Sequence, residues 1–140
     1  MKKTYANGGF NGRTTIIAHG YRQLAYDVST VTPAVYNSTK AAAFVAQIVA
    51  LNPTEFYSMI GVNDWLNVWS SGESGQVANF QAAATGFFGL LGAALPSVPI
   101  KVVSPLITIG REGVYISGTM DQYRAALSAA VTAVGLSNVT

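Results

Sequence analysis

Cysteine is absent from this 140-residue sequence, and charged residues and histidine are scarce. Without thiols the chain forms no disulfides and no thiolate metal sites, and we expect neither a metal nor a cofactor. The eight Lys and Arg residues are scattered and give a formal net charge of only +2. Because there is no basic run and no interleaving of aromatic with basic residues, we expect no nucleic-acid partner.

We expect neither a secretion signal nor a membrane span. It begins Met-Lys-Lys, but polar and glycine residues follow instead of an apolar region. The uncharged stretch between Glu73 and Lys101 is interrupted by polar residues and prolines, which favours a buried helix followed by a turn. We therefore expect no membrane partner. The lack of cysteine says nothing about compartment, so the localisation stays open.

Half of the residues are hydrophobic, which at this length allows one domain, residues 1–140, with a real core. Helical periodicity alternates along the chain with short β-branched or aromatic runs. The expected strands are 4–10, 55–60, 100–106 and 136–140, and the expected helices are 14–26, 39–51, 76–95 and 119–134. This order predicts an α/β fold of three α/β/α layers, with a mostly parallel sheet, right-handed crossovers and helices on both faces.

Two helices carry specific expectations. In the helix at 39–51, Phe44, Ile48 and Leu51 fall on one face, with Val45 and Val49 beside them. The helix at 76–95 has glycines at three-residue spacing, at positions 86, 89 and 92. These glycines lie inside a periodic segment and not at a strand-to-helix turn, so we interpret them as a small face for close helix packing and not as a phosphate loop.

In the stretch 56–65 an apolar, aromatic-rich run is followed by Gly61-Val62-Asn63-Asp64. A buried parallel strand ends in this way when polar groups stand at its carboxyl edge, where open α/β sheets bind ligands. The four residues resemble the GxND block of the SGNH (GDSL-like) hydrolases, a family of serine esterases, lipases and acetylhydrolases. The resemblance implies that the Asn63 amide donates to the oxyanion of a tetrahedral intermediate and that Asp64 braces the loop.

A second stretch, from Asn7 to Thr15, resembles the glycine block of the same family. The resemblance implies that Gly12 gives its backbone N–H to the oxyanion hole, and a backbone amide approaches a substrate closely only where no Cβ intervenes. The other reading of this stretch is a glycine-rich turn that starts a helix. His19 is interpreted as a structural histidine, because no nucleophile or orienting acid can be assigned to it.

The sequence departs from the family at both ends. It contains no Gly-Asp-Ser for the nucleophile and no Asp-x-x-His for the acid and base. We expect the first central strand and the C-terminal segment of an SGNH/flavodoxin-like fold to be missing. Because that strand would lie between the strands bearing Gly12 and Asn63, an isolated copy should dimerise, swap strands or rearrange its sheet.

Three interpretations stay open. The chain is the middle of a larger esterase, or a complementing chain supplies the serine and histidine, or the domain is a non-catalytic binding or structural module in a carbohydrate-binding, cell-surface or phage virion protein. The first two imply an ester or acetylated-carbohydrate substrate. Trp65 and Arg111 are the candidate substrate-binding residues, because Trp65 suits a sugar ring or aryl ester and Arg111 lies in a long loop that suits a substrate wall.

Overall fold

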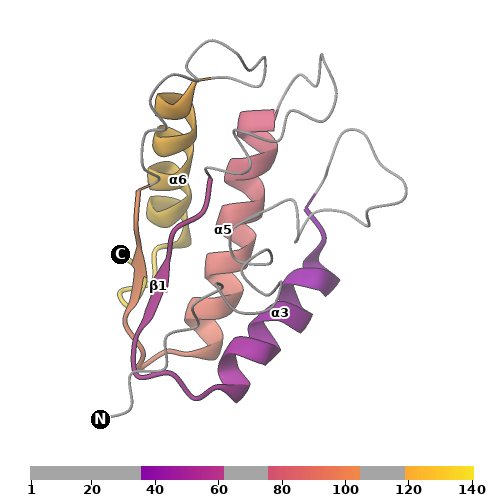
Figure 1. Ribbon diagram of the computed structural model, residues 1–140, viewed down its shortest axis with the longest axis vertical. Coiled ribbons are helices and arrows are strands. Elements are labelled where there is room, and N and C mark those ends of the chain that lie inside the picture. The colour runs from indigo at the N-terminus through magenta and orange to yellow at the C-terminus, as the bar shows by residue number, and fades with distance from the viewer. Residues whose placement is uncertain (1–35, 62–75, 105–118) are drawn as a thin grey trace.

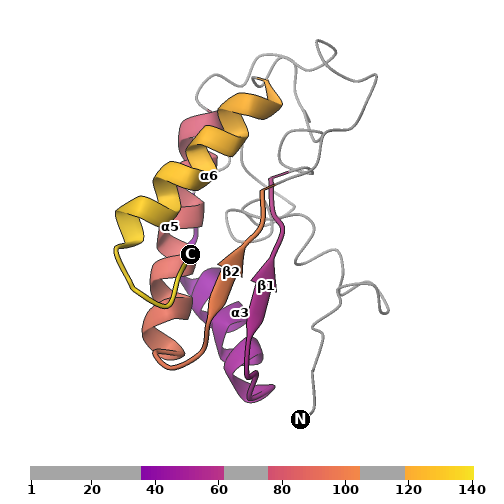
Figure 2. The same cartoon turned by 90° about the vertical axis from the view of Figure 1, so that its left-hand side faces the viewer.

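The structure is a computed structural model that describes residues 36–61, 76–104 and 119–140. In these ranges the elements follow the order α3, β1, α5, β2, α6. Two short strands lie side by side and the helices pack together next to them (Figures 1 and 2). The described part of the chain is therefore a mixed α/β unit, as the alternating sequence pattern predicted.

Helix α3 spans Ser38–Ala50. It begins where the Asn37 side chain accepts a hydrogen bond from the Lys40 backbone N–H at 3.0 Å, which satisfies one of the amides that a helix start leaves free. Its buried residues are Ala41, Val45 and Ile48, and Phe44 packs against the core from the edge.

The expectation that Leu51 and Val49 belong to this apolar face is wrong. Leu51 is 48% exposed and Val49 is 38% exposed. Leu51 is the C-cap of α3, and the next residue, Asn52, has a left-handed φ of 48°. The chain therefore leaves the helix axis at this point, and the helical spacing no longer decides which way Leu51 points.

Helix α5 spans Gln76–Ala94 and is the centre of the core, because it packs on α3 on one side and on α6 on the other. Its aromatic rings make the main contacts. Phe87 stacks on Phe44 of α3 with ring centroids 5.7 Å apart, and Phe80 lies 5.2 Å from the ring of Tyr123 in α6. The periodic apolar residues expected in this helix are confirmed as core residues: Phe80, Ala84, Phe87, Phe88, Leu91 and Leu95.

An 18-residue window of α5, Val77–Ala94, is long and apolar enough by length and composition to cross a membrane. Its mean hydropathy of 1.2 only reaches the usual threshold, and core helices of globular domains pass the same test. The contacts of α5 with α3 and α6 are those of such a core helix.

Strands β1 (Phe56–Ser58) and β2 (Ile100–Val102) pair in parallel, with Phe56 opposite Ile100 and Ser58 opposite Val102. Val139 makes a further parallel bridge to Ile100. The backbone of Thr140 both donates to the Ile100 carbonyl at 3.0 Å and accepts from the Val102 N–H at 2.7 Å. The parallel pairing and a third extended segment at the end of the chain, both expected from the sequence, are confirmed. β2 lies between the other two.

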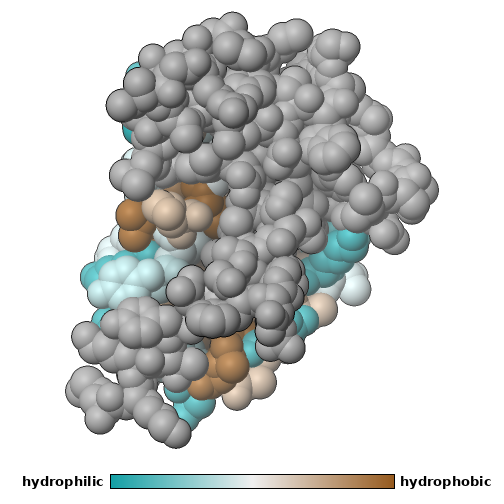
Figure 3. All heavy atoms as spheres, viewed as in Figure 1, coloured by the Kyte–Doolittle hydropathy of each residue, from teal (hydrophilic) through white to brown (hydrophobic). Residues whose placement is uncertain are grey.

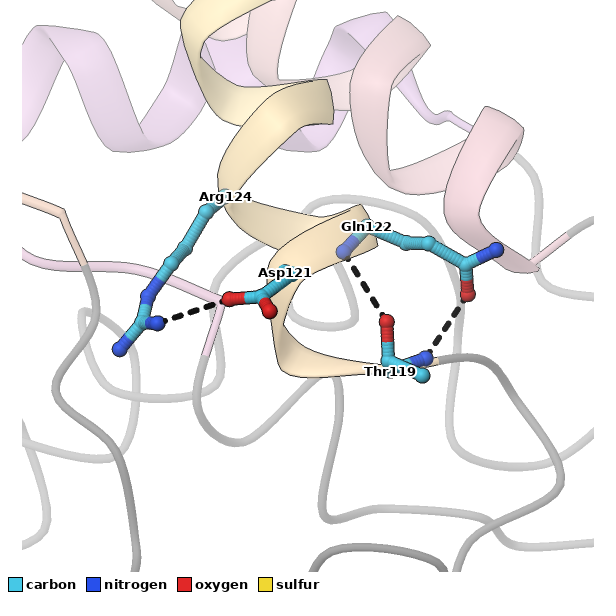
Figure 4. Close-up of polar contacts among 4 residues, drawn as sticks. All are labelled: Thr119, Asp121, Gln122 and Arg124. Carbon is cyan, nitrogen blue, oxygen red and sulfur yellow. Dashed lines mark hydrogen bonds and ion pairs between the residues drawn. The ribbon is translucent and has the colours of Figure 1, made fainter.

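Helix α6 spans Met120–Val134 and begins at a capping box (Figure 4). The Thr119 hydroxyl accepts from the Gln122 N–H at 3.3 Å, and the Gln122 side chain accepts from the Thr119 N–H at 2.8 Å. Beside it Arg124 pairs with Asp121 at 2.9 Å on the surface. Gly135 ends the helix in the left-handed conformation. Both helix ends are therefore at the positions that the sequence predicted.

The C-terminal residues bind the end of α5. The Asn138 side-chain amide donates to the carbonyls of Gly92 and Leu95 at 3.2 and 2.9 Å, where the last turn of a helix leaves carbonyls without partners.

The three glycines of α5 differ in how closely other residues approach them. At Gly92 a Cβ would lie only 2.8 Å from Val139 Cγ2, and at Gly86 it would lie 2.5 Å from the Tyr36 ring, whereas at Gly89 nothing lies within 4 Å. Gly86 and Gly92 are therefore closely packed, but against residues outside the helices, and Gly89 is not, so the expected close packing of helix on helix at these glycines is wrong.

Candidate functional site

The carboxyl edge of the sheet is the place where the sequence predicts a site. Because β1 and β2 are parallel, their carboxyl ends meet at the same edge. In Figure 1 this edge is at the upper end of the strands. Gly61 follows β1 at this edge, and Ser104 follows β2 with an exposed side chain.

Gly61 is the one residue of the GxND block that the structure describes. It is buried and has a φ of 112°, in the region that L side chains rarely adopt. The residues just before it belong to the strand layer, with Ile60 and Ser58 buried against the core. The chain thus bends three residues after β1, and only glycine adopts this φ without backbone strain. This is the physical reason for a glycine at this point.

The helices give this edge a positive electrostatic character. In Figure 1 α5 and α6 begin toward the upper end of the molecule and α3 begins at about mid-height, and all three run down against the direction of β1. A helix N-terminus carries a partial positive charge from its aligned peptide dipoles. Among the described residues, Asp121 is the only acidic residue in the first turn of any of the three helices, and it is bound to Arg124.

Tyr36 is the described residue whose pKa is shifted by the fold. Its ring packs against Gly86 of α5, and its hydroxyl oxygen is buried without a hydrogen-bond partner. Burial raises the pKa of the Tyr36 hydroxyl above its ordinary value of 10.0, because the charged phenolate loses hydration. A hydroxyl held neutral in this way is a poor nucleophile and serves packing.

The opposite end of the sheet has an open depression of roughly 310 Å³ between residues 96–99 and 137–140. Its one charged side chain, Lys101, donates a hydrogen bond to the Thr140 hydroxyl at 3.0 Å. It lies at the amino-terminal end of β2, away from the edge where polar groups follow the strands. In the described ranges no three His, Asp or Glu side chains come together to hold a metal ion.

The residues that the sequence analysis assigned to the site lie outside the described residues. These are Gly12 and Asn63 as oxyanion donors, Trp65 and Arg111 as substrate contacts, and also Asp64 and His19. The structure thus describes the strand ends and the helix starts around the expected site. What the sequence reasoning missed is Asn138, which caps α5, and an asparagine after a glycine-ended helix gives no distinctive signal for such a role.

Comparisons with known proteins leave the family unassigned, since no protein-family model, no curated protein and no solved structure matches this chain. The parallel sheet and the turn at Gly61 are therefore the physical observations on which a function can be proposed.

Proposed function

We propose that this chain is an SGNH-type acyl-hydrolase domain that contributes the oxyanion-hole half of an active site. In this proposal the Gly12 N–H and the Asn63 amide bind the developing oxyanion of an ester or acetylated-carbohydrate substrate. The serine and the histidine come from outside these residues, because the sequence contains neither Gly-Asp-Ser nor Asp-x-x-His. The observation that carries the proposal is the buried Gly61, with a φ of 112°, three residues after the end of a parallel strand.

The geometry of β1 supports the role of Asn63. The strand runs toward the edge at which the helices begin, and Asn63 follows Gly61 by two residues (Figure 1). An oxyanion needs hydrogen-bond donors that are fixed before the reaction starts, and a residue close to a rigid strand end meets this requirement better than one in a long loop. The positive helix ends around this edge would stabilise the same negative charge.

The outward face of the sheet supports a three-layer α/β/α arrangement for the complete domain. Tyr57 is 58% exposed and Met59 48%, and both alternate with buried residues, while Val103 beyond the end of β2 is 40% exposed. Figure 3 shows a hydrophobic patch above hydrophilic surface on the left-hand side of the molecule, where Figure 1 places the two strands. Parallel sheets are almost always covered on both faces, so a second layer of helices belongs here.

The test compares the chain alone with the hydrolase assembled from this chain and the neighbouring coding sequence. We expect p-nitrophenyl acetate hydrolysis at background for the chain alone. In the assembled enzyme Asn63→Ala should lower kcat by roughly 100- to 1,000-fold, because one oxyanion donor is worth about 2.7–4 kcal/mol. Asn67→Ala, the same substitution four residues further on, should leave kcat unchanged.

Two results would contradict the proposal. One is a neighbouring sequence with neither a Gly-Asp-Ser nor an Asp-x-x-His motif. The other is an assembled enzyme in which Asn63→Ala and Asn67→Ala are equally active. The alternative function is a non-catalytic SGNH-like module that binds carbohydrate or serves a structural role. It is favoured by the absent motifs, and it predicts binding of acetylated oligosaccharides that Asn63→Ala does not weaken, as measured by calorimetry.

A further inference from the structure

The helices that cover the sheet carry very little charge. α3, α5 and α6 stand in a row with α5 in the middle (Figure 1), and their charged residues are Lys40, Asp121 and Arg124. All three lie within the first five residues of their helix, and α5 has no charged residue along its 19 residues. A helix that faces water normally carries charged or polar residues on the side opposite its apolar stripe. These helices depart from that rule.

The second half of α5 shows the departure most clearly. Residues 86–94 read Gly-Phe-Phe-Gly-Leu-Leu-Gly-Ala-Ala and include no polar side chain. Phe87 and Phe88 are buried in the core, but Leu90 is 39% exposed and Ala93 is exposed as well. A helix that is apolar on all sides is normally a buried helix. The outward side of α5 therefore has the composition of a contact surface.

Both neighbouring helices continue this surface. We define the outer helix face as the exposed residues of the three helices beyond the first turns of α3 and α6, and none of them is charged: Ala42, Ala43, Ala46, Gln47, Val49, Ala50, Ala78, Ala82, Leu90, Ala93, Ala94, Ala125, Ser128, Ala129, Thr132 and Ala133. Most of these side chains are small, which lets the ridges of a partner's helices enter the grooves between them. At Gly89, among these residues, a Cβ would meet nothing within 4 Å. The face is therefore open to close approach.

The size of the outer helix face suits a protein partner. The helices have 13, 19 and 15 residues and are about 20–28 Å long at a rise of about 1.5 Å per residue. Packed helices stand about 8–10 Å apart, so a row of three is roughly 25 Å wide. The face thus offers on the order of 600 Å² per copy, which is the lower end of the roughly 600–1,000 Å² that each partner buries in a specific interface.

The absence of charge favours a second copy of this chain as the occupant. In a two-fold symmetric contact the same patch meets itself, so a charge near the axis would face its own like charge. The outer helix face avoids this repulsion, and it offers no charge that would select an acidic or a basic partner. The ion pair between Asp121 and Arg124 would stay at the rim of such a contact.

We propose that the outer helix face is the interface of a homodimer, in which α5 of one copy packs against α5 of the other. This face is on the side of the helices that points away from the sheet, so the second helix layer proposed for the opposite face of the sheet is compatible with the dimer. The inference rests on the composition and exposure of the helices and not on any catalytic activity.

Sedimentation velocity on the full chain between about 1 and 100 µM tests the inference, and we expect a dimer with a dissociation constant in the micromolar range. Ala82→Glu and Ala93→Lys each place a charge on the outer helix face, with a sign that suits its position in the helix dipole. Each should raise the dissociation constant at least about 10-fold, because the charge would lose its water in the interface. Both variants should keep the circular dichroism of the folded chain, since both alanines are exposed.

Two further variants serve as controls in the same assay. Gly89→Ala keeps the outer helix face small and uncharged, so it should change the dissociation constant by less than about 3-fold. Tyr57→Glu places a charge on the outward face of the sheet instead, where Tyr57 is 58% exposed, and it should leave the dimer intact.

Three results would overturn the inference. The first is a chain that stays monomeric at the highest concentration. The second is a dimer that Ala82→Glu and Ala93→Lys leave intact, or that Tyr57→Glu dissociates, because another surface would then join the copies. The third is binding to phosphatidylcholine vesicles in a flotation assay that Ala82→Glu and Ala93→Lys abolish, since a membrane surface would then cover the face.

Discussion

The glycines of α5 allow one substitution to be tested twice on the same helix with opposite expected outcomes. Gly89 and Gly92 both lie inside α5, so alanine at either position gains about 1 kcal/mol of helix propensity. At Gly89 a new Cβ meets nothing within 4 Å. We therefore expect Gly89→Ala to raise the free energy of unfolding by about 0.5–1 kcal/mol.

At Gly92 the same gain is opposed by overpacking. A Cβ there would lie 2.8 Å from both Leu136 Cδ1 and Val139 Cγ2. Leu136 is 36% exposed and can rotate away, but Val139 is 4% exposed and bridges Ile100 in the sheet. Overpacking of this kind costs about 1–3 kcal/mol, so Gly92→Ala should be less stable than Gly89→Ala by roughly that amount.

Urea unfolding followed by circular dichroism at 222 nm measures both variants. A double substitution provides the control, because Val139→Ala removes the atom that the new Cβ would meet. Gly92→Ala combined with Val139→Ala should be less destabilised than the sum of the two single variants. Equal unfolding free energies for Gly89→Ala and Gly92→Ala would refute the packing of the C-terminal segment against α5.

Three further substitutions test other parts of the fold. Asn138→Asp should lower the free energy of unfolding by about 1–3 kcal/mol in urea titrations, because it removes the donor to α5 and places a negative charge at a helix C-terminus. An unchanged urea midpoint would show that Asn138 does not cap α5. Gly61→Ala should cost about 1–3 kcal/mol, since φ is 112° there, and a thermal melt at or above that of the unmodified chain would contradict the turn. The raised pKa of the Tyr36 hydroxyl means that its contribution to stability is intact below pH 10 and is lost as the pH rises through the folded-state value. Tyr36→Phe should therefore reduce the loss of stability above pH 10; parallel pH profiles of the two proteins would show that this hydroxyl is not desolvated.

Local patterns in the sequence were sufficient to predict the helices that the structure describes. The capping box at Thr119 and the glycine at position 135 predicted both ends of α6, and the spacing of Phe80, Phe87 and Leu91 predicted the buried side of α5. These signals depend on residues within one or two turns of each other. Where the chain leaves a helix this local rule ends, which is why Leu51 was wrongly expected in the core.

The candidate site also has one part that a local sequence pattern predicted and another part that it could not predict. The run before the GxND pattern predicted a strand at 55–60, and β1, Phe56–Ser58, confirms a shorter one that ends before Gly61. Which donors come together at the carboxyl edge depends on which strand lies next to β1, and a short pattern contains no information about a partner fifty residues away. The roles of Gly12, Asn63, Trp65 and Arg111 accordingly stay predictions.

The sequence by itself determined the order of the described helices and strands, the caps of α6 and the apolar side of α5, because these follow from backbone geometry and spacing along a single segment. Only the tertiary structure decided that β2 lies between β1 and the C-terminal segment, that Asn138 caps α5, and that Gly92 is crowded while Gly89 is not. Each of these depends on atoms that are far apart in the chain and meet only when the core closes, so their energies have no local signature.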